Sequence, residues 1–264
     1  MGEVIEVGEG LKEEWVGRRV ATYRRGYHAQ YIVGSPDDSP VIPPEVPDDQ
    51  ATFFALAAIA MNGVRKGRVR WGEAVVVYGL GIVGQLALRF CHFAGAELVV
   101  GIDIAEPRIA YLPDSPRIRG INPADCDPRK YMQELNRGRL ADVVFEVTGN
   151  PDIIPEEFHV LRRQGRFVVL SSPRDNTTFD FHDLCNWPSF QIIGAHASSH
   201  PPVSTPQNPW TKERHAQLFF GLIADGELDI ESLISHRESY EKAPELYNML
   251  LEDRSRAMGV VLEW

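Results

Sequence analysis

Cysteine is scarce in this sequence of 264 residues, which contains only three. Cys91, Cys126 and Cys185 lie far apart, and none belongs to a Cys-x-x-Cys pair. This spacing argues against a disulfide framework and against a cysteine-ligated zinc cluster, both of which need several well-spaced cysteines. We therefore expect reduced cysteines packed inside a cytoplasmic protein, and we expect no metal site.

A long apolar run and an excess of basic residues are also missing. The longest purely apolar run, residues 53–61, is too short to span a bilayer. The first residues, Met-Gly-Glu-Val-Ile-Glu, resemble neither a basic leader nor an apolar signal core. With 27 basic and 37 acidic residues the formal net charge is −10, which disfavours a phosphate-rich partner. We expect a small-molecule substrate, with no nucleic acid and no membrane as partner.

The most specific feature that is present is the segment Ala74-Val-Val-Val-Tyr-Gly-Leu-Gly-Ile-Val-Gly-Gln85. An apolar β-forming run leads into Gly79, Gly81 and Gly84, and a helical pattern follows directly. Gly79 permits a tight strand-to-helix turn, Gly81 lets a pyrophosphate approach the backbone, and Gly84 lets the helix pack close to the strand. The helix N-terminus offers its amides to the phosphate charge. This order predicts a dinucleotide site; the alternative is a coincidental glycine-rich turn.

A carboxylate ends the next expected strand. Asp103 follows the apolar segment 98–102, at the place where an acid accepts both hydroxyls of an adenosine ribose. A 2′-phosphate placed there would meet an unpaired negative charge, so Asp103 favours NAD(H) over NADP(H). The alternative is that Asp103 only caps the end of its strand.

Strands and helices alternate from Glu73 onward, which predicts an α/β fold with a doubly wound parallel sheet. Residues 106–128 contain five prolines, so we expect a short or broken helix there. The expected strands of this sheet are 74–78, 98–103, 142–148, 166–171 and 190–194. The helices expected after the one that follows the glycine turn are 131–138, 155–163, 212–225 and 241–252. A final strand is expected over residues 259–264.

The first 50 residues have a different pattern. Alternating segments 3–7, 16–21 and 27–33 predict strands, and a stretch rich in Pro and Asp, residues 35–49, predicts a domain crossing. Asp48 or Asp49 is expected to cap an apolar helix over residues 50–66, with Gly67 past its end.

The order of these motifs resembles the medium-chain dehydrogenase/reductase family, which includes zinc alcohol and polyol dehydrogenases. The resemblance extends over nearly the whole chain. The segments similar to family motifs are Gly2-Glu-Val-Ile-Glu-Val-Gly8, Val16-Gly-Arg-Arg-Val20, Gly26-Tyr-His-Ala-Gln-Tyr31, Val144-Phe-Glu-Val-Thr-Gly149 and Leu161-Arg-Arg-Gln-Gly-Arg-Phe-Val-Val-Leu170. The ending, from Leu233 to Trp264, resembles the family's return to its first domain.

The resemblance implies a Rossmann domain over residues 51–198, flanked by an incomplete GroES-like β-barrel domain built from both chain ends. Residues 1–50 form part of that catalytic domain, and residues 199–264 form the return segment that completes it. A homo-oligomer is also implied, as a dimer joined through the last Rossmann strand near residues 190–197. An open barrel would leave edge strands and apolar surface that need cover.

The resemblance also assigns a set of residues that contact NAD. The glycine turn and the start of its helix would meet the pyrophosphate, Asp103 and Arg108 the adenosine ribose, and three strand-end residues the rest of the coenzyme. An alternative for Arg108 is a solvated surface arginine. The full set is Gly79, Gly81, Ile82, Val83, Gly84, Asp103, Arg108, Thr148, Ser171 and His196.

The zinc ligands of the family have no counterpart here. The family's Cys and Gly-His-Glu ligands lie upstream of the segment at which this chain begins, and Ala55 occupies the position of a further ligand. A four-cysteine loop for structural zinc is missing between Val20 and Tyr27. Catalytic zinc needs three protein ligands and an open position, so we expect no zinc, and the catalytic residues stay unassigned.

Several other polar residues have two interpretations each. His196 and His200 could pair on a metal, but Pro201 follows directly, and loop histidines or a nicotinamide contact fit better. Asn62 could face the nicotinamide or cap a helix. His28 stands where the family has an aromatic ring, so packing is its expected role. The segment Asp180-Phe-His182-Asp183 offers acid and base types, yet its alternation indicates a simple strand or turn.

Three hypotheses about function follow. The first is an NAD(H)-dependent oxidoreductase that transfers hydride between nicotinamide and an alcohol, polyol or carbonyl, without catalytic zinc. The second is a shortened relative that binds NAD(H) without turnover. The third is that this sequence is a fragment of a longer zinc-dependent dehydrogenase.

Overall fold

The computed structural model describes residues 1–23 and 28–264. These residues form two compact units. The central unit is Ile59–Ser199, and the terminal unit joins Met1–Ala58 with His200–Trp264. Within the described ranges, no helix has the length and apolar character needed to cross a membrane.

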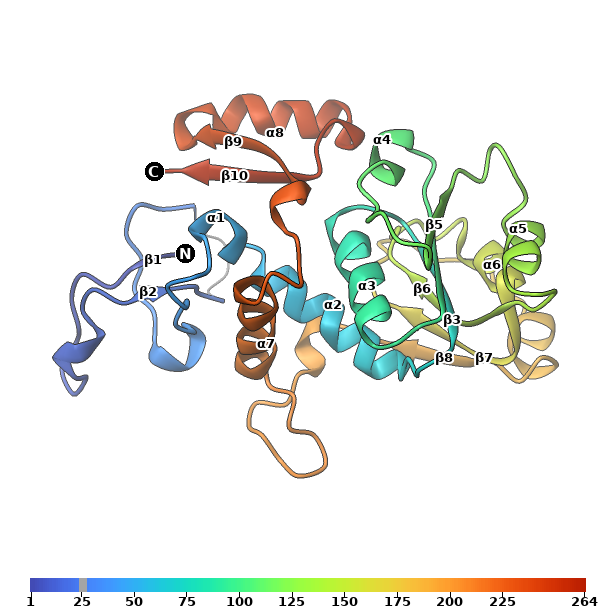
Figure 1. Cartoon of the computed structure of the whole chain (residues 1–264), viewed down its shortest axis with the longest axis horizontal. Helices are drawn as coiled ribbons and strands as arrows, with labels where there is room; N and C mark the ends of the chain where they lie inside the picture. Colours follow the sequence, from blue (N-terminus) through green and yellow to red (C-terminus); the bar gives the residue numbers. More distant parts are fainter. Residues whose placement is uncertain (24–27) are drawn as a thin grey trace. The chain divides into compact units, whose positions relative to one another are not determined.

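The central unit is built on a six-stranded sheet in which every neighbouring pair is parallel, so the expected doubly wound α/β class is confirmed (Figure 1). The strand order is β5-β4-β3-β6-β7-β8. The chain order reverses at β3, whose carboxyl end is therefore the place where such sheets open a ligand crevice. The strands are β3 (Ala74–Tyr78), β4 (Leu98–Ile102), β5 (Ile118–Ile121), β6 (Ala141–Glu146), β7 (Leu161–Val169) and β8 (Gln191–Gly194).

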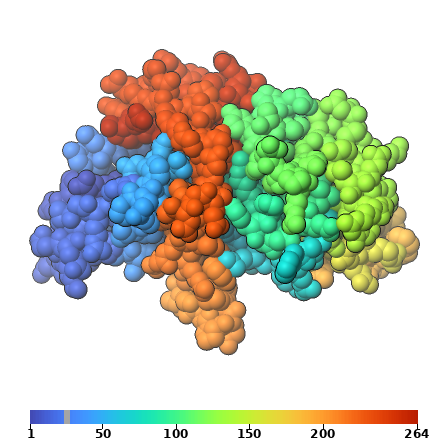
Figure 2. All heavy atoms as spheres, viewed as in Figure 1, coloured from blue at the N-terminus to red at the C-terminus, as the bar shows by residue number. Residues whose placement is uncertain are grey.

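Helices cover both faces of this sheet. On one face Val76, Val144 and Phe167 pack with Met132 and Phe158, which lie in or next to α5 (Pro128–Leu135) and α6 (Ile154–Glu157). On the opposite face α2 (Phe54–Gly67) approaches so closely that a Cβ at its last residue would lie 2.9 Å from the ring of Phe145. The remaining helices of this unit are α3 (Ile82–Phe93) and α4 (Glu106–Ile109). The segment that carries α4, coloured green, lies on the surface of the unit (Figure 2).

The described strands of the terminal unit form two two-stranded sheets. In the first, β1 (Gly2–Glu3) pairs antiparallel with β2 (Arg19–Val20). In the second, β9 (Ile234–Ser239) pairs parallel with β10 (Gly259–Glu263), and α8 (Ala243–Glu252) connects them. The other helices are α1 (Asp48–Ala51), the first residues of α2, and α7 (Lys212–Ala224).

The early strands are much shorter than their alternating sequence predicts. Of the expected strand 3–7 only Glu3 is in a strand, and of 16–21 only Arg19 and Val20. The segment 28–33 forms no strand, and Tyr31 and Val33 are 70% and 81% exposed. Gly26 and Tyr27 of the same motif lie outside the described residues. Alternation makes a strand only where a neighbouring strand takes its backbone hydrogen bonds.

The expected cap of the 50–66 helix is wrong. The helix is two pieces, α1 and α2, and Pro47 precedes α1 without a side-chain cap. The two candidate caps bind arginines instead: Asp48 pairs with Arg19, and Asp49 pairs with Arg237 at 2.7 Å. Asp49 Oδ1 also accepts from the Gln50 amide at 2.8 Å, but Asp48 and Asp49 lie inside α1 and neither is its N-cap.

Two further expectations are corrected in the central unit. The proline-rich segment holds the short helix α4, as expected, but it also holds β5, which was not predicted and forms because Ile118 and Ile121 fill the core beside β4. The expected helix 155–163 ends early: α6 is followed by a 3₁₀ turn, Phe158–Val160, and β7 begins at Leu161. Leu161 pairs with Ala141 across a register shift, so β6 draws the chain into the sheet sooner than its pattern indicates.

Candidate functional site: the carboxyl edge of the central sheet

The glycine turn connects β3 to α3 at the switch point of the sheet. Gly79 has φ +89°, and its amide donates to the Ile102 carbonyl at 2.8 Å. A Cβ on Gly79 would lie 2.9 Å from the Thr148 amide nitrogen, and one on Gly84 would lie 1.8 Å from the Gly79 carbonyl oxygen. Both positions therefore require glycine for close backbone packing.

Gly81 differs from the other two glycines. An added Cβ would meet no atom within 4 Å, so the surroundings of Gly81 do not require glycine. Gly81 is the N-cap of α3 and makes no side-chain cap, and the first intrahelical bond runs from the Gln85 amide to the Gly81 carbonyl at 2.9 Å. The amides of Ile82, Val83 and Gly84 precede that bond and point out of the helix end, where an anion is stabilised.

Asp103 follows β4 and is 6% exposed. Its Oδ2 accepts a 2.7 Å hydrogen bond from the Leu80 amide, inside the glycine turn, and its Oδ1 accepts from the Ala105 amide at 2.9 Å. Each carboxylate oxygen has two lone pairs, so acceptor capacity is left for a ligand. The Asp103 carboxylate is thus fixed against the turn rather than free in solvent.

Arg108 lies beside this carboxylate. Its Nη1 is 3.5 Å from Asp103 Oδ2, and its side chain is 24% exposed, so it is not the solvated surface arginine of the alternative interpretation. Gln85, which is fully buried, donates to the Arg108 carbonyl at 2.8 Å, and Arg89 donates to Gln85 Oε1 at 2.7 Å. This inner layer of polar contacts joins α3 to α4; sequence reasoning did not single it out.

Glu146, the last residue of β6, is the largest omission of the sequence analysis. It is fully buried, and its Oε1 accepts from the Thr148 amide at 2.7 Å, the Gly149 amide at 2.8 Å and the Thr148 hydroxyl at 2.8 Å. Its Oε2 accepts from the Ser171 hydroxyl. The signal was available, because an acid ends this strand just as Asp103 follows β4.

A second buried carboxyl group lies close to Glu146. Glu157 is 1% exposed, and among the described residues neither of its oxygens has a hydrogen-bond partner. Burial, followed by the charge of Glu146, raises the pKa of Glu157 to about 10. Glu157 is therefore a neutral carboxylic acid at physiological pH, near the Glu146 carboxyl group, which accepts from four donors.

His196 is exposed and belongs to the loop after β8. Its Nδ1 accepts from the Ser198 amide at 3.1 Å. Asn62 does not cap α2, because its amide donates to Ser199 Oγ at 2.9 Å and to the His196 carbonyl at 3.5 Å. Asn62 thus ties α2 to the His196 loop.

The remaining polar candidates have structural contacts. The His28 ring packs edge-on against Tyr247, with centroids 6.4 Å apart, as its packing role predicts. His200 packs edge-on against His215 in the terminal unit. His182 and Asp183 pair with each other at 2.6 Å on an exposed turn.

Most of the predicted coenzyme residues of the central unit are connected through contacts with one another, and His196 is separate. The glycines, Asp103 and Arg108 form one connected cluster, and Thr148 joins it through its backbone contact with Gly79. Ser171 is linked to Thr148 through Glu146. His196 instead contacts Asn62, Ser198 and Ser199, so its role as a coenzyme contact stays a prediction.

The described residues were also tested as ligands for zinc. Among them, no group of three or more His, Cys, Asp or Glu side chains is arranged to hold a metal ion. Catalytic zinc in dehydrogenases needs three such ligands, so the described residues do not fit it.

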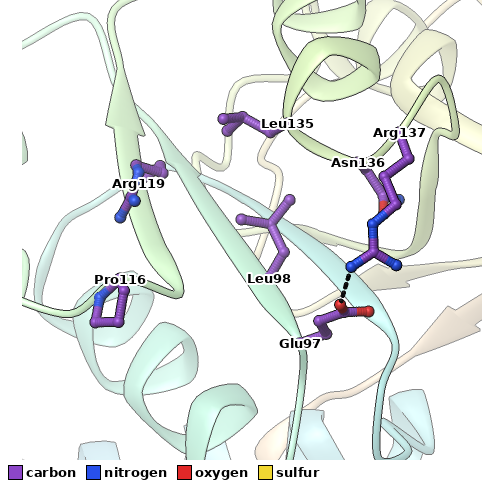
Figure 3. Close-up of a pocket in the computed structure, with 7 residues that line it drawn as sticks. All are labelled: Glu97, Leu98, Pro116, Arg119, Leu135, Asn136 and Arg137. Atoms are coloured by element: carbon purple, nitrogen blue, oxygen red, sulfur yellow. Dashed lines mark hydrogen bonds and ion pairs between the residues drawn. The ribbon is translucent and has the colours of Figure 1, made fainter.

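A surface pocket of about 210 Å³ lies at the opposite, amino-terminal edge of the sheet, where β4 and β5 begin (Figure 3). Glu97 and Arg137 form a 3.1 Å ion pair at its rim. This pocket is therefore separate from the glycine turn, which lies at the carboxyl ends of the strands. Its lining residues are Glu97, Leu98, Pro116, Arg119, Leu135, Asn136 and Arg137.

Comparisons with known proteins show which family model, relatives and solved structures this chain is similar to. Residues 83–210 match the family model of zinc-binding dehydrogenases. The D-guloside 3-dehydrogenase of Escherichia coli (strain K12) is 28% identical, over 98% of this chain and 75% of its own length. Two solved structures share the fold. An alcohol dehydrogenase of Escherichia coli CFT073 with NADH has a TM-score of 0.81 and 17% identity, and the match covers 98% of this chain and 80% of that chain. A protein described as a zinc-binding dehydrogenase of Sinorhizobium meliloti 1021, bound to NADP, has a TM-score of 0.78 and 18% identity, and the match covers 93% of this chain and 77% of that chain.

A doubly wound sheet with a glycine turn at its switch point and an acid beside it defines the class of dinucleotide-binding oxidoreductases. Together with the comparisons, this supports a member of the medium-chain dehydrogenase/reductase family. Members of this family use a nicotinamide coenzyme, and the two structures above contain NADH and NADP respectively.

Proposed function

We propose that this chain binds NAD(H) along the carboxyl edge of the central sheet and transfers hydride between nicotinamide and an alcohol, polyol or carbonyl substrate. The observation that carries the proposal is the Asp103 carboxylate, held 2.7 Å from the Leu80 amide inside the glycine turn. This arrangement presents a fixed acid to the adenosine ribose and helix amides to the pyrophosphate.

The residues proposed to hold the coenzyme fall into three regions. Gly81, Ile82, Val83 and Gly84 would surround the pyrophosphate, with Gly79 shaping the turn. Asp103 and Arg108 would contact the adenosine ribose. Thr148, Ser171 and His196 would face the nicotinamide half. The nicotinamide ring supplies the hydride; the chain supplies binding and orientation.

The choice of NAD(H) rests on charge. A 2′-phosphate at the ribose would lie against the Asp103 carboxylate, which is only 6% exposed and poorly screened. The positive charge of Arg108 offsets part of this repulsion, since its Nη1 lies 3.5 Å from Asp103 Oδ2. We propose that Asp103 dominates because two backbone amides fix its position.

Calorimetric titration with NAD⁺, NADH, NADP⁺ and NADPH tests this proposal. We expect NADH to bind more tightly than NADPH. Absence of heat with all four coenzymes, together with no change in melting temperature, would refute the proposal.

We propose that turnover, where it occurs, does not use zinc. The described residues offer no three-ligand group, whereas the family model that matches is that of zinc-binding dehydrogenases. Elemental analysis of purified protein, with activity assayed before and after a chelator, tests this point. Activity that a chelator abolishes and zinc restores would contradict it.

The second candidate function is coenzyme binding without turnover. The same shortage of metal ligands favours it. A panel of alcohols, polyols and ketones discriminates the two, because oxidation or reduction that scales with protein concentration supports the enzyme and eliminates the binding module.

Two further expectations belong to this proposal. We propose a homodimer formed through β8, the last strand in the sheet order, on which Ile192 is 43% exposed. We also propose a cytoplasmic protein, which is supported by three cysteines that form no disulfide.

A further inference from the structure

The hydroxyl protons of Thr148 and Ser171 both point to one buried carboxylate. Thr148 Oγ1 donates to Glu146 Oε1 at 2.8 Å, and Ser171 Oγ donates to Glu146 Oε2. A hydroxyl group has a single proton, so each of these side chains has only lone pairs left for any other partner. The Thr148 hydroxyl already uses one lone pair, since it accepts from the Asn150 amide at 3.1 Å.

Glu146 is an obligate acceptor in this arrangement. Backbone amides can only donate, and two of them, from Thr148 and Gly149, bond to its Oε1. The nearby Glu157 carboxyl is buried among the described residues without a hydrogen-bond partner and does not compete for these donors. The four donors therefore all bond to Glu146, which accepts both hydroxyl protons.

Ser171 lies where the second half of a dinucleotide would pass. The acid that serves the adenosine ribose follows β4, and the phosphate-facing helix follows β3. The rest of the ligand must then extend in the other direction, across the ends of β6 and β7. Ser171 follows β7 and is half-buried, whereas Glu146, which orients it, is completely buried.

Gly149 lies next to Ser171. It has φ +70°, which favours glycine, and an added Cβ would lie 3.9 Å from Ser171 Oγ, an ordinary van der Waals distance. The Ser171 side chain is half-buried and thus partly accessible.

We propose that Glu146 is a positioning residue that makes the Ser171 hydroxyl an obligate hydrogen-bond acceptor for a donor group on the nicotinamide riboside half of the coenzyme. This inference rests on the proposed function. The donor is an N–H of the carboxamide or an O–H of the nicotinamide ribose. A carbonyl oxygen at the same place would be repelled, because Ser171 has no proton to offer it.

Coenzyme analogues separate the two donors. In 3-acetylpyridine adenine dinucleotide a methyl group replaces the carboxamide NH₂ while the carbonyl stays, and a 3′-deoxy nicotinamide riboside analogue lacks one ribose O–H. Calorimetry gives the ratio of dissociation constants of each analogue to NAD⁺. We expect one of the two analogues to bind roughly twofold to tenfold more weakly than NAD⁺, the range for one neutral hydrogen bond.

Ser171→Ala is the decisive variant, and it should bring that ratio close to one. Glu146→Gln should do the same in a folded protein, because its amide can donate to Ser171 and release the hydroxyl proton. Ser115→Ala is the control: Ser115 precedes β5 at the far edge of the sheet, and its hydroxyl accepts from the Arg117 amide. This control should leave the ratio unchanged.

The outcomes distinguish this inference from the proposed function. If NAD⁺ binds and the ratios in Ser171→Ala equal those of the parent protein, the inference is overturned and the coenzyme site stands. If no coenzyme binds the parent protein, the proposed function fails and this inference fails with it. Should Glu146→Gln not fold, Ser171→Ala alone decides, since its hydroxyl can be removed without leaving a buried donor unpaired.

Discussion

The Leu80 amide donates a 2.7 Å hydrogen bond to Asp103 Oδ2, and this bond joins the glycine turn to the end of the neighbouring strand. The carboxylate is thereby held in place before any ligand arrives. Binding then has little side-chain freedom to remove, which favours affinity for a ligand that fits.

Replacing Asp103 by Ser should reverse or erase the coenzyme preference. We expect the NADH-to-NADPH affinity ratio to fall about tenfold to hundredfold, the range for a lost hydrogen bond to a charged group. Arg108 remains and can pair with a 2′-phosphate. The double variant Asp103→Ser/Arg108→Ala should therefore bind NADPH more weakly than Asp103→Ser alone. Calorimetry measures both, and an unchanged ratio in the single variant would remove Asp103 from its assigned role.

Two glycines of the same turn should respond to alanine in opposite ways. Gly84→Ala places a Cβ 1.8 Å from the Gly79 carbonyl oxygen, so we expect a loss of about 1–3 kcal/mol in the free energy of unfolding, or more. Gly81→Ala meets no atom within 4 Å and should leave stability almost unchanged. Its methyl group faces the proposed pyrophosphate position instead, so NADH binding should weaken. Urea unfolding and calorimetry together test the pair. A destabilised Gly81→Ala that binds NADH normally would contradict this division.

Glu157 should make the protein less stable as the pH rises. Its pKa is about 10 in the folded chain, well above the ordinary glutamate value, because burial and the charge of Glu146 disfavour ionisation. Between these two pKa values the folded state holds a proton that the unfolded state releases. The free energy of unfolding therefore decreases with pH, by about 1.4 kcal/mol per pH unit for one proton.

Glu157→Gln should remove that slope while it preserves the shape of the side chain. Urea unfolding at a series of pH values from about 5 to about 9 measures it. Glu156→Gln is a matched control, since this neighbouring carboxylate is exposed and lies 3.5 Å from His159 Nε2 on the surface. If both variants retain the pH dependence of the parent protein, Glu157 is not the group responsible.

The proposed dimer makes Ile192 a sensitive position. Ile192 lies on β8, the last strand of the sheet, and a lysine there places a charge in an interface that would extend the sheet. We expect Ile192→Lys to convert a dimer to a monomer, measured by light scattering coupled to size-exclusion chromatography. Val203→Lys, at a site 66% exposed in the terminal unit, is the control and should retain the parent mass. A monomeric parent protein would end this proposal.

The sequence was most informative where local chemistry and fold agree. The apolar run before Gly79, the helix after Gly84 and the acid at Asp103 each have a local physical requirement, so their order could be recognised without a structure. It was least informative where a strand depends on a partner. Residues 28–33 alternate but form no strand, whereas residues 118–121 lie among prolines and form β5 because β4 offers them an edge.

The polar layer behind the site was missed for a related reason. Glu146 and Gln85 look like ordinary polar residues in the sequence, because their importance comes from being completely buried. The donors that Glu146 satisfies come from residues two, three and 25 positions away. Spacing within a motif cannot reveal a contact between the ends of two different strands.

The backbone contact at Gly79 has a practical consequence for redesign. The missing Cβ of Gly79 would lie 2.9 Å from both the carbonyl oxygen of Val147 and the amide of Thr148, so two loops touch main chain to main chain. No flexible side chain lies between them to absorb a shift. Insertions or deletions made after β6 to broaden substrate range should therefore disturb coenzyme affinity as well, and both loops would have to be redesigned as one piece.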